Sequence, residues 1–243
     1  MKQPYISIVV PAYNEAHLIA DTLVSLDHYL SNLGKTYEIL VVDDGSKDDT
    51  AKIVDKLRSM ISNVLLIGHG RNMGKGAAVR TGILAARGKY RLFLDADHST
   101  SIDHLGQALL LLKDHDIIIG SRGVDGSVLD VPQSWIKRSF GNLGNLFVRG
   151  LLLRGVKDTQ CGFKLFKEDV VETLFTKQRI DGWSFDIELL AMSKKLGYSV
   201  KEMPVRWVDG PKSRVGPWSY MQVFIDILKI RWWLWRNSHN LPQ

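Results

Sequence analysis

The chain has little cysteine and no long apolar run, and each absence excludes a class of protein. Cys161 is the one cysteine in 243 residues, so no intrachain disulfide framework is possible, and a reducing compartment is expected. No window approaches the roughly 18 uninterrupted apolar residues of a transmembrane helix. Residues 1–5 also lack the apolar stretch and cleavage site of a secretory signal. These absences predict a cytoplasmic protein, or one on the cytoplasmic face of a membrane.

Two common nucleotide-binding motifs are also missing. The stretch 68–74 is one residue too long for the glycine-rich dinucleotide fingerprint. Lys75 is followed by Gly76 rather than by serine or threonine, and His69 stands where a Walker A loop begins with glycine, so that motif fails as well. The stretch 72–76 still places a lysine and flexible backbone before a predicted helix, whose N-terminus would be able to approach an anion.

What is present describes an ordinary globular protein with a basic surplus. Hydrophobic residues make up 45% of the chain and charged residues 24%, and the length suits one large domain. The formal charge of +6 and the pI near 9.3 suit an anionic ligand, a phosphate or a membrane surface, without choosing among them. We expect a catalytic domain over residues 1–217 and a tryptophan-rich amphipathic tail over 218–243.

The first half alternates strand and helix patterns. Apolar runs of strand length are separated by segments of helix length, which predicts βαβ units and a mostly parallel sheet with flanking helices, an α/β fold. Asp48 or Asp49 would cap the second helix. The predicted strands are 6–10, 38–42, 64–67, 90–94 and 117–120, and the predicted helices are 15–33, 48–60 and 76–87.

Acidic residues follow three of these predicted strands. Glu15 comes after the first, Asp43 and Asp44 after the second, and Asp95 and Asp97 after the strand 90–94. The carboxyl ends of parallel strands share one edge of a sheet, so the acids should converge on a cleft that holds a cation or a polar ligand. Carboxylate oxygens suit Mg²⁺ or Mn²⁺, which carry diphosphates. A solvated Asp-x-Asp turn is the alternative for an isolated motif.

The second half is basic and apolar. Residues 131–157 include five basic residues and no acidic one, with apolar residues interleaved. The tail adds Trp232, Trp233 and Trp235 beside Lys229 and Arg231. Tryptophan with basic residues is typical of a membrane interface, and helices packed on the sheet are the alternative.

Several motifs, taken together, resemble inverting family 2 glycosyltransferases of the GT-A fold. They are the stretches 7–15, 41–50 and 72–76, followed by Asp95-Ala96-Asp97. Three further stretches, 121–122, 158–164 and 183–188, resemble the branch that glycosylates dolichyl or polyprenyl phosphate. The resemblance runs from about residue 6 to residue 215, and similarity to the dolichyl-phosphate β-glucosyltransferases favours UDP-glucose as donor.

The resemblance implies a role for each site residue. Asp97, Arg122, Arg138 and Asp186 are the predicted catalytic residues. Asp186 is expected to position other groups, with a general base as the minority view, because a phosphomonoester with a second pKa near ~6 is already largely ionised. The donor would be held by Pro11, Tyr13, Glu15, Asp43, Lys75, Asp95, Ala96 and Asp97, of which Asp95 and Asp97 would bind Mg²⁺ or Mn²⁺. The acceptor phosphate would be held by Arg122, Arg138, Asn142 and one of Lys212 and Arg214.

The implied activity is transfer of one sugar from a nucleotide-sugar to a polyprenyl or dolichyl phosphate with inversion. GDP-mannose is the alternative donor. A transferase acting on a sugar hydroxyl is a second possibility, although residues 229–232 do not match the Gln-x-x-Arg-Trp motif of processive synthases. A non-catalytic nucleotide- or lipid-binding protein is a third. Without a predicted transmembrane helix, membrane attachment would be peripheral or mediated by a partner, and no nucleic-acid partner is expected.

Overall fold

A seven-stranded sheet forms the centre of the molecule, with the strand order β3-β2-β1-β4-β7-β5-β8. The computed structural model describes residues 3–130, 150–153, 155–208 and 217–236, apart from the side chains of 217–220. All neighbouring strands are parallel except around β7, which runs antiparallel to both β4 and β5. The strands are β1 Ile6–Ala12, β2 Tyr37–Asp43, β3 Val64–Gly68, β4 Tyr90–Leu94, β5 Ile117–Ser121, β7 Phe163–Lys167 and β8 Val200–Pro204.

The predicted mostly parallel sheet is confirmed, and its inner strands are buried on both faces. Along β1, Ile8 and Val10 enter the core on one face, whereas Val9 enters the core on the other. A strand covered on both faces has apolar residues at successive positions, which is why the sequence signal was a continuous apolar run. The antiparallel strand β7 was not predicted. A small second sheet pairs β6 Val128–Leu129 with β9 Arg206–Trp207.

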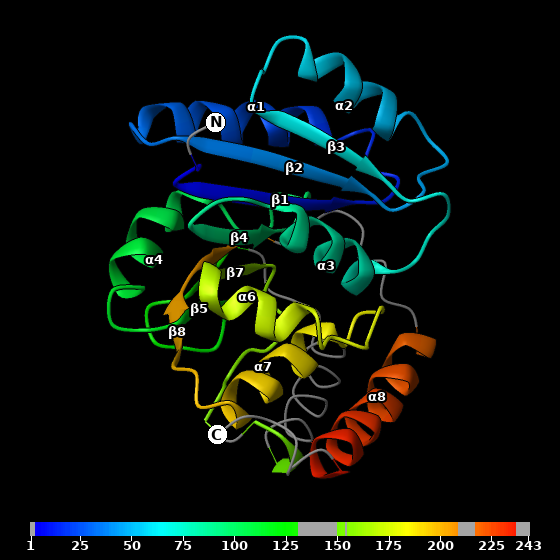
Figure 1. Ribbon diagram of the computed structural model, residues 1–243, viewed down its shortest axis with the longest axis vertical. Coiled ribbons are helices and arrows are strands. Elements are labelled where there is room, and N and C mark those ends of the chain that lie inside the picture. Colours follow the sequence, from blue (N-terminus) through cyan, green and yellow to red (C-terminus); the bar gives the residue numbers. More distant parts are fainter. Residues whose placement is uncertain (1–2, 131–149, 154, 209–216, 237–243) are drawn as a thin grey trace.

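Helices cover the two faces of the sheet (Figure 1). One face is covered by α1 Ile19–Asn32, α2 Thr50–Arg58 and α4 Leu105–Leu111, which follows the short helix η1 Ile102–His104. The other is covered by α3 Lys75–Ala85, α6 Glu168–Phe175 and α7 Phe185–Lys195. The first helix begins later than predicted because Asn14 has a left-handed backbone, with φ of 52°, and a turn follows it. Asp49 stands at the N-cap of α2 without a side-chain bond to the helix backbone, while the Asp48 side chain accepts the Thr50 amide.

The last described helix, α8 Pro217–Arg236, lies beside α7 at the end of the molecule away from β3 (Figure 1). Ile227, Ile230 and Trp233 on one side of α8 are buried in the same cluster as the core residues of α7. No helix within the described ranges is long and apolar enough to cross a membrane. The predicted basic segment 131–157 falls largely outside those ranges, as do Arg138, Asn142, Lys212 and Arg214.

Candidate functional site

The loops after β1 and β2 are bonded to each other. The Asn14 amide donates to Ser46 Oγ at 2.9 Å, and the Lys47 amide donates to Asn14 Oδ1 at 2.8 Å. The Glu15 amide donates to Thr50 Oγ1 at 2.8 Å. Asn tolerates the left-handed conformation that this exchange requires. The two loops that carry the predicted nucleoside contacts therefore form one structural unit.

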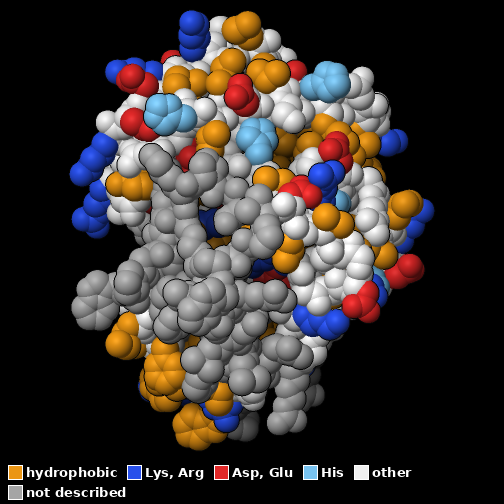
Figure 2. Space-filling view, turned by 180° about the vertical axis from the view of Figure 1, so that it is seen from behind, with side chains coloured by type: hydrophobic (Ala, Val, Ile, Leu, Met, Phe, Trp, Pro, Cys, Tyr) orange, Lys and Arg blue, Asp and Glu red, His pale blue; other side chains and the backbone are white. Residues whose placement is uncertain are grey.

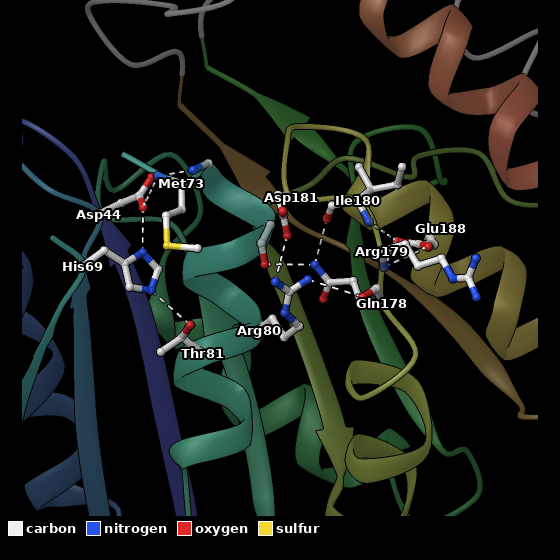
Figure 3. A network of polar contacts seen from close by, with 12 residues as sticks. Asp44, His69, Met73, Arg80, Thr81, Gln178, Arg179, Ile180, Asp181 and Glu188 are labelled. Carbon is white, nitrogen blue, oxygen red and sulfur yellow. Dashed lines mark hydrogen bonds and ion pairs between the residues drawn. The ribbon is translucent and has the colours of Figure 1, made fainter. Parts of the chain in front are cut away.

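The two acids after β2 have different partners. Asp43 is buried, and its Oδ1 accepts the Ser46 amide at 3.2 Å. Asp44 turns toward the loop before α3, where it accepts the amides of Met73 and Gly74, both at 2.9 Å, and lies 2.7 Å from His69 Nδ1 (Figure 3). The two acids after β2 thus have separate local partners, and Asp44 serves to hold the loop before α3.

The start of α3 is closely packed rather than flexible. The Ala77 amide donates to the carbonyl of Asp181 at 3.1 Å, so it faces a protein carbonyl instead of a ligand anion. A Cβ on Gly74 would lie 2.4 Å from the same carbonyl oxygen, and one on Gly76 would lie 2.6 Å from the carbonyl oxygen of Ile180. These glycines permit close approach of the backbone of residues 180–181 to the start of α3.

Residues 178–181, which cover the start of α3, are held by α7 (Figure 3). Glu188 Oε2 accepts the amides of Arg179 and Ile180 at 3.0 and 2.8 Å. Burial raises the pKa of Glu188 against the opposing effect of these bonds. Gln178 Nε2 donates to the carbonyl of Gly76 at 2.9 Å, and Arg80 pairs with Asp181 at 2.8 Å. The backbone of Lys75 is therefore fixed before any ligand arrives.

Lys75 points at the first acid of the Asp-x-Asp motif. Its Nζ lies 2.7 Å from Asp95 Oδ1, and the two side chains are only 18% and 19% exposed. The ammonium also lies 5.3 Å from the ring centre of Phe93 and 5.2 Å from that of Trp183. Burial by itself would lower the pKa of Lys75, but Asp95, Asp186 and Asp97 outweigh it and the pKa is raised. Lys75 is thus a fixed positive charge beside Asp95.

Asp95 and Asp97 offer the donor set of a magnesium or manganese site. Asp97 Oδ1 accepts the Ser99 amide at 3.0 Å, which orients its carboxylate. Over the described part of the chain, no group of three or more His, Cys, Asp or Glu residues is arranged to hold a metal ion. Two carboxylates fit a cation that takes its other ligands from water and a diphosphate, as Mg²⁺ commonly does. The carboxylates of Asp95 and Asp97 are therefore compatible with a divalent cation.

Asp186 lies in the interior beside Lys164. Lys164 Nζ is 2.8 Å from Asp186 Oδ1 and donates to the carbonyl of Cys161 at 2.6 Å, and both charged side chains are buried. Burial raises the pKa of Asp186, while Lys164 and Lys75 act in the opposite direction. A buried, ion-paired carboxylate is suited to orienting charges around it.

Arg122 is held by Asp158 through two side-chain bonds. Its Nε and Nη2 donate to Asp158 Oδ2 and Oδ1 at 2.6 and 2.9 Å, and its amide donates to Oδ2 at 3.0 Å. Burial tends to raise the pKa of Asp158, but the bonds and charge of Arg122 prevail and lower it. Arg122 remains 28% exposed, and its Nη1 bonds to none of the described residues. The guanidinium is thus oriented with donors left for an anion.

Asp95 and Arg122 lie at the same edge of the sheet. Asp95 follows β4 and Arg122 follows β5, and these strands run in the same direction because both are antiparallel to β7. A carboxylate pair for a cation and an oriented arginine for an anion therefore open on one edge, the usual ligand position in such sheets.

Comparison with known families identifies the chain. The family model described as "Glycosyl transferase family 2" matches residues 7–175. The chain belongs to glycosyl transferase family 2. The predicted family and the glycosyltransferase activity are confirmed by this match.

Curated relatives of this glycosyltransferase cover most of its length. The dolichyl-phosphate β-glucosyltransferase of Dictyostelium discoideum is 36% identical over 242 residues, which span 93% of this chain and 74% of the relative. The human protein of the same name is 34% identical over 244 residues, with the same coverage.

Solved structures share the fold at lower identity. The mannosyltransferase PcManGT from Pyrobaculum calidifontis, in complex with GDP-Man and Mn²⁺, has a TM-score of 0.63 and 22% identity, covering 100% of this chain and 67% of that one. The glucosyl-3-phosphoglycerate synthase from Mycobacterium tuberculosis, with Mn²⁺, UDP-Glc and phosphoglyceric acid, has a TM-score of 0.65 and 20% identity, covering 94% and 80%. The predicted GT-A architecture is confirmed by these neighbours.

Sequence reasoning predicted several residues that the structure brings to one edge of the sheet in this glycosyltransferase, but it missed much of what connects them. Asp95, Asp97 and Arg122 lie at the expected edge, and Lys75 contacts Asp95. Asp158 and Lys164 lie in the motif 158–164, but the motif alone did not indicate a role for either residue. Glu188, likewise inside a quoted motif, was not predicted as the anchor of residues 178–181.

Proposed function

We propose that this glycosyltransferase transfers glucose from UDP-glucose to a dolichyl or related polyprenyl phosphate, with inversion at the anomeric carbon. The main support for this proposal is a sequence identity of 32–36%, over about nine-tenths of the chain, to proteins named dolichyl-phosphate β-glucosyltransferase. The oriented Arg122 near the acidic pair supports a phosphate acceptor. GDP-mannose is the alternative donor, and no contact among the described residues favours it.

On the donor side, Asp95 and Asp97 would hold Mg²⁺ or Mn²⁺ with the diphosphate. The cation, when bound, neutralises charge on the leaving nucleoside diphosphate. Lys75 adds a second positive charge next to Asp95. The nucleoside and the rest of the donor would contact residues of the bonded loops after β1 and β2 and of the acidic motif, namely Pro11, Tyr13, Glu15, Asp43 and Ala96.

On the acceptor side, Arg122 would bind the lipid phosphate. Its guanidinium presents a planar set of donors that matches phosphate oxygens, and Asp158 fixes its orientation. Arg138, Asn142 and one of Lys212 and Arg214 complete the proposed acceptor site. These four lie outside the described residues, and their roles rest on the family resemblance.

In the proposed reaction, an oxygen of the lipid phosphate attacks the anomeric carbon while the bond from that carbon to the UDP oxygen breaks. Attack from the opposite side inverts the centre, and UDP leaves. The second pKa of a phosphomonoester is near ~6, so the nucleophile needs little help from a base at neutral pH. Asp186, buried against Lys164, would orient Lys75 and Lys164 rather than remove a proton.

We further propose peripheral attachment to the cytoplasmic face of a membrane through the exposed side of α8. The exposed apolar residues of α8 follow one another at intervals of one, three or four positions, which places their side chains on one side of the helix. Lys229, Arg231 and Arg236 are also exposed. Figure 2 shows hydrophobic and basic side chains together at the end where α8 lies. The exposed apolar residues of α8 are Met221, Phe224, Ile225, Leu228, Trp232 and Trp235.

A donor-by-acceptor screen tests this proposal. Purified protein is incubated with labelled UDP-glucose, GDP-mannose or UDP-N-acetylglucosamine, each with polyprenyl phosphate, 3-phosphoglycerate or a glucose oligosaccharide, with Mg²⁺, Mn²⁺ or chelator. We expect label in the lipid phase from UDP-glucose alone, only with a cation, and a β-linked product by NMR. Transfer from GDP-mannose alone would contradict the donor, and transfer only to a non-lipid acceptor would contradict the acceptor.

A further inference from the structure

We infer that residues 158–164, here called the linking segment, position the donor side and the acceptor side of the site relative to each other. The linking segment leads into β7, the strand inserted between β4 and β5. Because β7 is antiparallel to both, the segment enters the sheet at the edge where β4 and β5 end. It therefore passes between Asp95 and Arg122. The inference uses the proposed function only to name the two ligands.

The first residue of the linking segment fixes the acceptor-side arginine. Asp158 is 4% exposed and receives three hydrogen bonds from Arg122. Its own backbone is fixed from β8, because Glu202 accepts the amides of Lys157 and Asp158 at 2.8 and 2.9 Å. Arg122 is thus oriented by a carboxylate that is itself held on both sides.

Gly162, in the second half of the linking segment, contacts Asp95, the acid on the donor side. The Asp95 amide donates to the carbonyl of Gly162 at 3.1 Å. A Cβ on Gly162 would lie 2.0 Å from Asp95 Oδ2, 2.3 Å from Cγ and 2.9 Å from Cβ, closer than real Cβ atoms come to any neighbour. Gly162 is not in the left-handed region, so space rather than backbone conformation requires the glycine. The position of the Asp95 carboxylate depends on the missing side chain.

The last residue of the linking segment reaches the buried carboxylate. Lys164 pairs with Asp186 and donates to the carbonyl of Cys161 within the same segment. Cys161 is enclosed in turn, since its Sγ lies 3.6 Å from Thr100 Oγ1 and a Cβ on Gly120 would come within 2.9 Å of it. Three residues of one seven-residue segment, Asp158, Gly162 and Lys164, therefore contact Arg122, Asp95 and Asp186, and a shift of the segment would move all three.

Gly162→Ala is the first test, with Gly70→Ala as the matched control because a Cβ at Gly70 meets nothing within 4 Å. The added methyl group should force the Asp95 side chain into another rotamer and weaken Mn²⁺ binding about tenfold or more by calorimetry, the lower end of what outer-sphere changes cost. The Gly70 variant should bind Mn²⁺ like the original protein. Equal Mn²⁺ affinity in Gly162→Ala would overturn the inference.

A stability cycle separates this contact from general damage to the fold. Asp95→Gly removes the whole side chain that the new methyl group would meet, including Cβ. Gly162→Ala should therefore lower the melting temperature clearly in the original protein and much less in the Asp95→Gly background. An equal loss in both backgrounds would show that Gly162 acts through something other than Asp95. Neither the cycle nor the Mn²⁺ titration uses a sugar donor or lipid, so both remain interpretable if the proposed function fails.

Asp158→Asn tests the acceptor end, with Asp130→Asn as control because Asp130 pairs with the largely exposed Arg206. If the linking segment orients Arg122, the Asp158 variant should raise KM for the lipid phosphate severalfold and leave Mn²⁺ affinity near that of the original protein. The Asp130 variant should change neither. A loss of Mn²⁺ affinity without a change in acceptor KM would contradict the assignment of the two ends.

Discussion

At the residue scale, the charges of the site are arranged in pairs. Lys75 faces Asp95, Lys164 faces Asp186 and Arg122 faces Asp158, at 2.7, 2.8 and 2.6 Å. Leaving one member of a buried pair alone costs about 3–5 kcal/mol, because the remaining charge has no solvent to replace its partner. The pairs therefore hold these carboxylates in place before a ligand is present.

Asp97→Asn should abolish transfer without unfolding the protein. Asparagine retains an oxygen to accept the Ser99 amide but removes the charge that a cation requires. Loss of several kcal/mol of transition-state stabilisation would lower kcat/KM by about 100-fold or more. The measurement is glucosyl transfer into lipid, with the melting temperature determined in parallel. Asp103→Asn, which changes an exposed acid bonded to Ser101, is the control and should transfer normally. Full transfer by Asp97→Asn in the presence of chelator would exclude the metal assignment.

The pair Arg122–Asp158 predicts a dependence of stability on pH. The pKa of Asp158 is lower in the folded chain than its usual value near 3.8, so the unfolded chain binds more protons between the two pKa values. The stability from this pair is complete above pH ~5 and is lost as the pH falls below about 4. The free energy of unfolding, measured by urea denaturation from pH 7 to pH 2.5, should therefore fall less steeply for Asp158→Asn than for the original protein. Parallel curves for the two proteins would contradict the assigned shift.

How far the sequence predicted the site depends on how local each signal was. Asp95, Asp97 and Arg122 directly follow strands, so residue type and strand pattern sufficed to place them. The pairing of Lys164 with Asp186 joins β7 to α7, and the contact of Glu188 with Arg179 joins α7 to a loop. Such buried polar contacts are set by packing, which no periodicity in the chain reports.

At the scale of elements, the five predicted strands were right because each is a short, mainly apolar run, and β1, β2 and β5 are buried along nearly their whole length. β7 was missed because its sequence, FKLFK, mixes buried apolar residues with lysine, and Lys164 is itself buried. A lysine at a core position breaks the apolar signal unless its partner is known. The central position of β7 could thus not be derived from its own composition.

The packing of α3 gives a prediction about stability. A Cβ on Gly76 would lie 2.6 Å from the Ile180 carbonyl oxygen and 2.7 Å from Phe185 Cβ, so Gly76→Ala overpacks the contact between α3 and α7. We expect destabilisation of about 1–3 kcal/mol, although alanine is the better helix former. Gly68→Ala, at an open position at the end of β3, is the control in urea unfolding. Equal midpoints for the two variants would mean that the segment 178–181 moves aside freely.

At the scale of the whole molecule, α8 packs on the same core as the helices that cover the sheet. Trp233 is buried with the core residues of α7, and the Arg179 guanidinium lies 4.7 Å from its ring centre. Trp232 and Trp235 on the same helix are 54% and 74% exposed. The sequence left open whether these tryptophans close the core or face a membrane. The helix has one buried side and one exposed side, so deleting it would remove core contacts and could not test docking alone.

Point substitutions on the exposed side provide the sharper test of membrane docking. The double variant Trp232→Ser, Trp235→Ser should fold normally but pellet less with anionic vesicles, and the original protein should show a blue shift in tryptophan emission that the variant lacks. Salt should release part of the bound protein, since basic residues near an anionic surface contribute about 1 kcal/mol each and are screened beyond about 10 Å at ~0.1 M salt.

Met60→Ser, which changes another highly exposed apolar residue just after α2, is the control and should bind vesicles normally. With a short, water-soluble prenyl phosphate the double variant should retain its turnover, because the substitutions leave the acidic motif and Arg122 unchanged. Unaltered vesicle binding, or equal loss of turnover with short and long acceptors, would show that this side of α8 does not face the membrane.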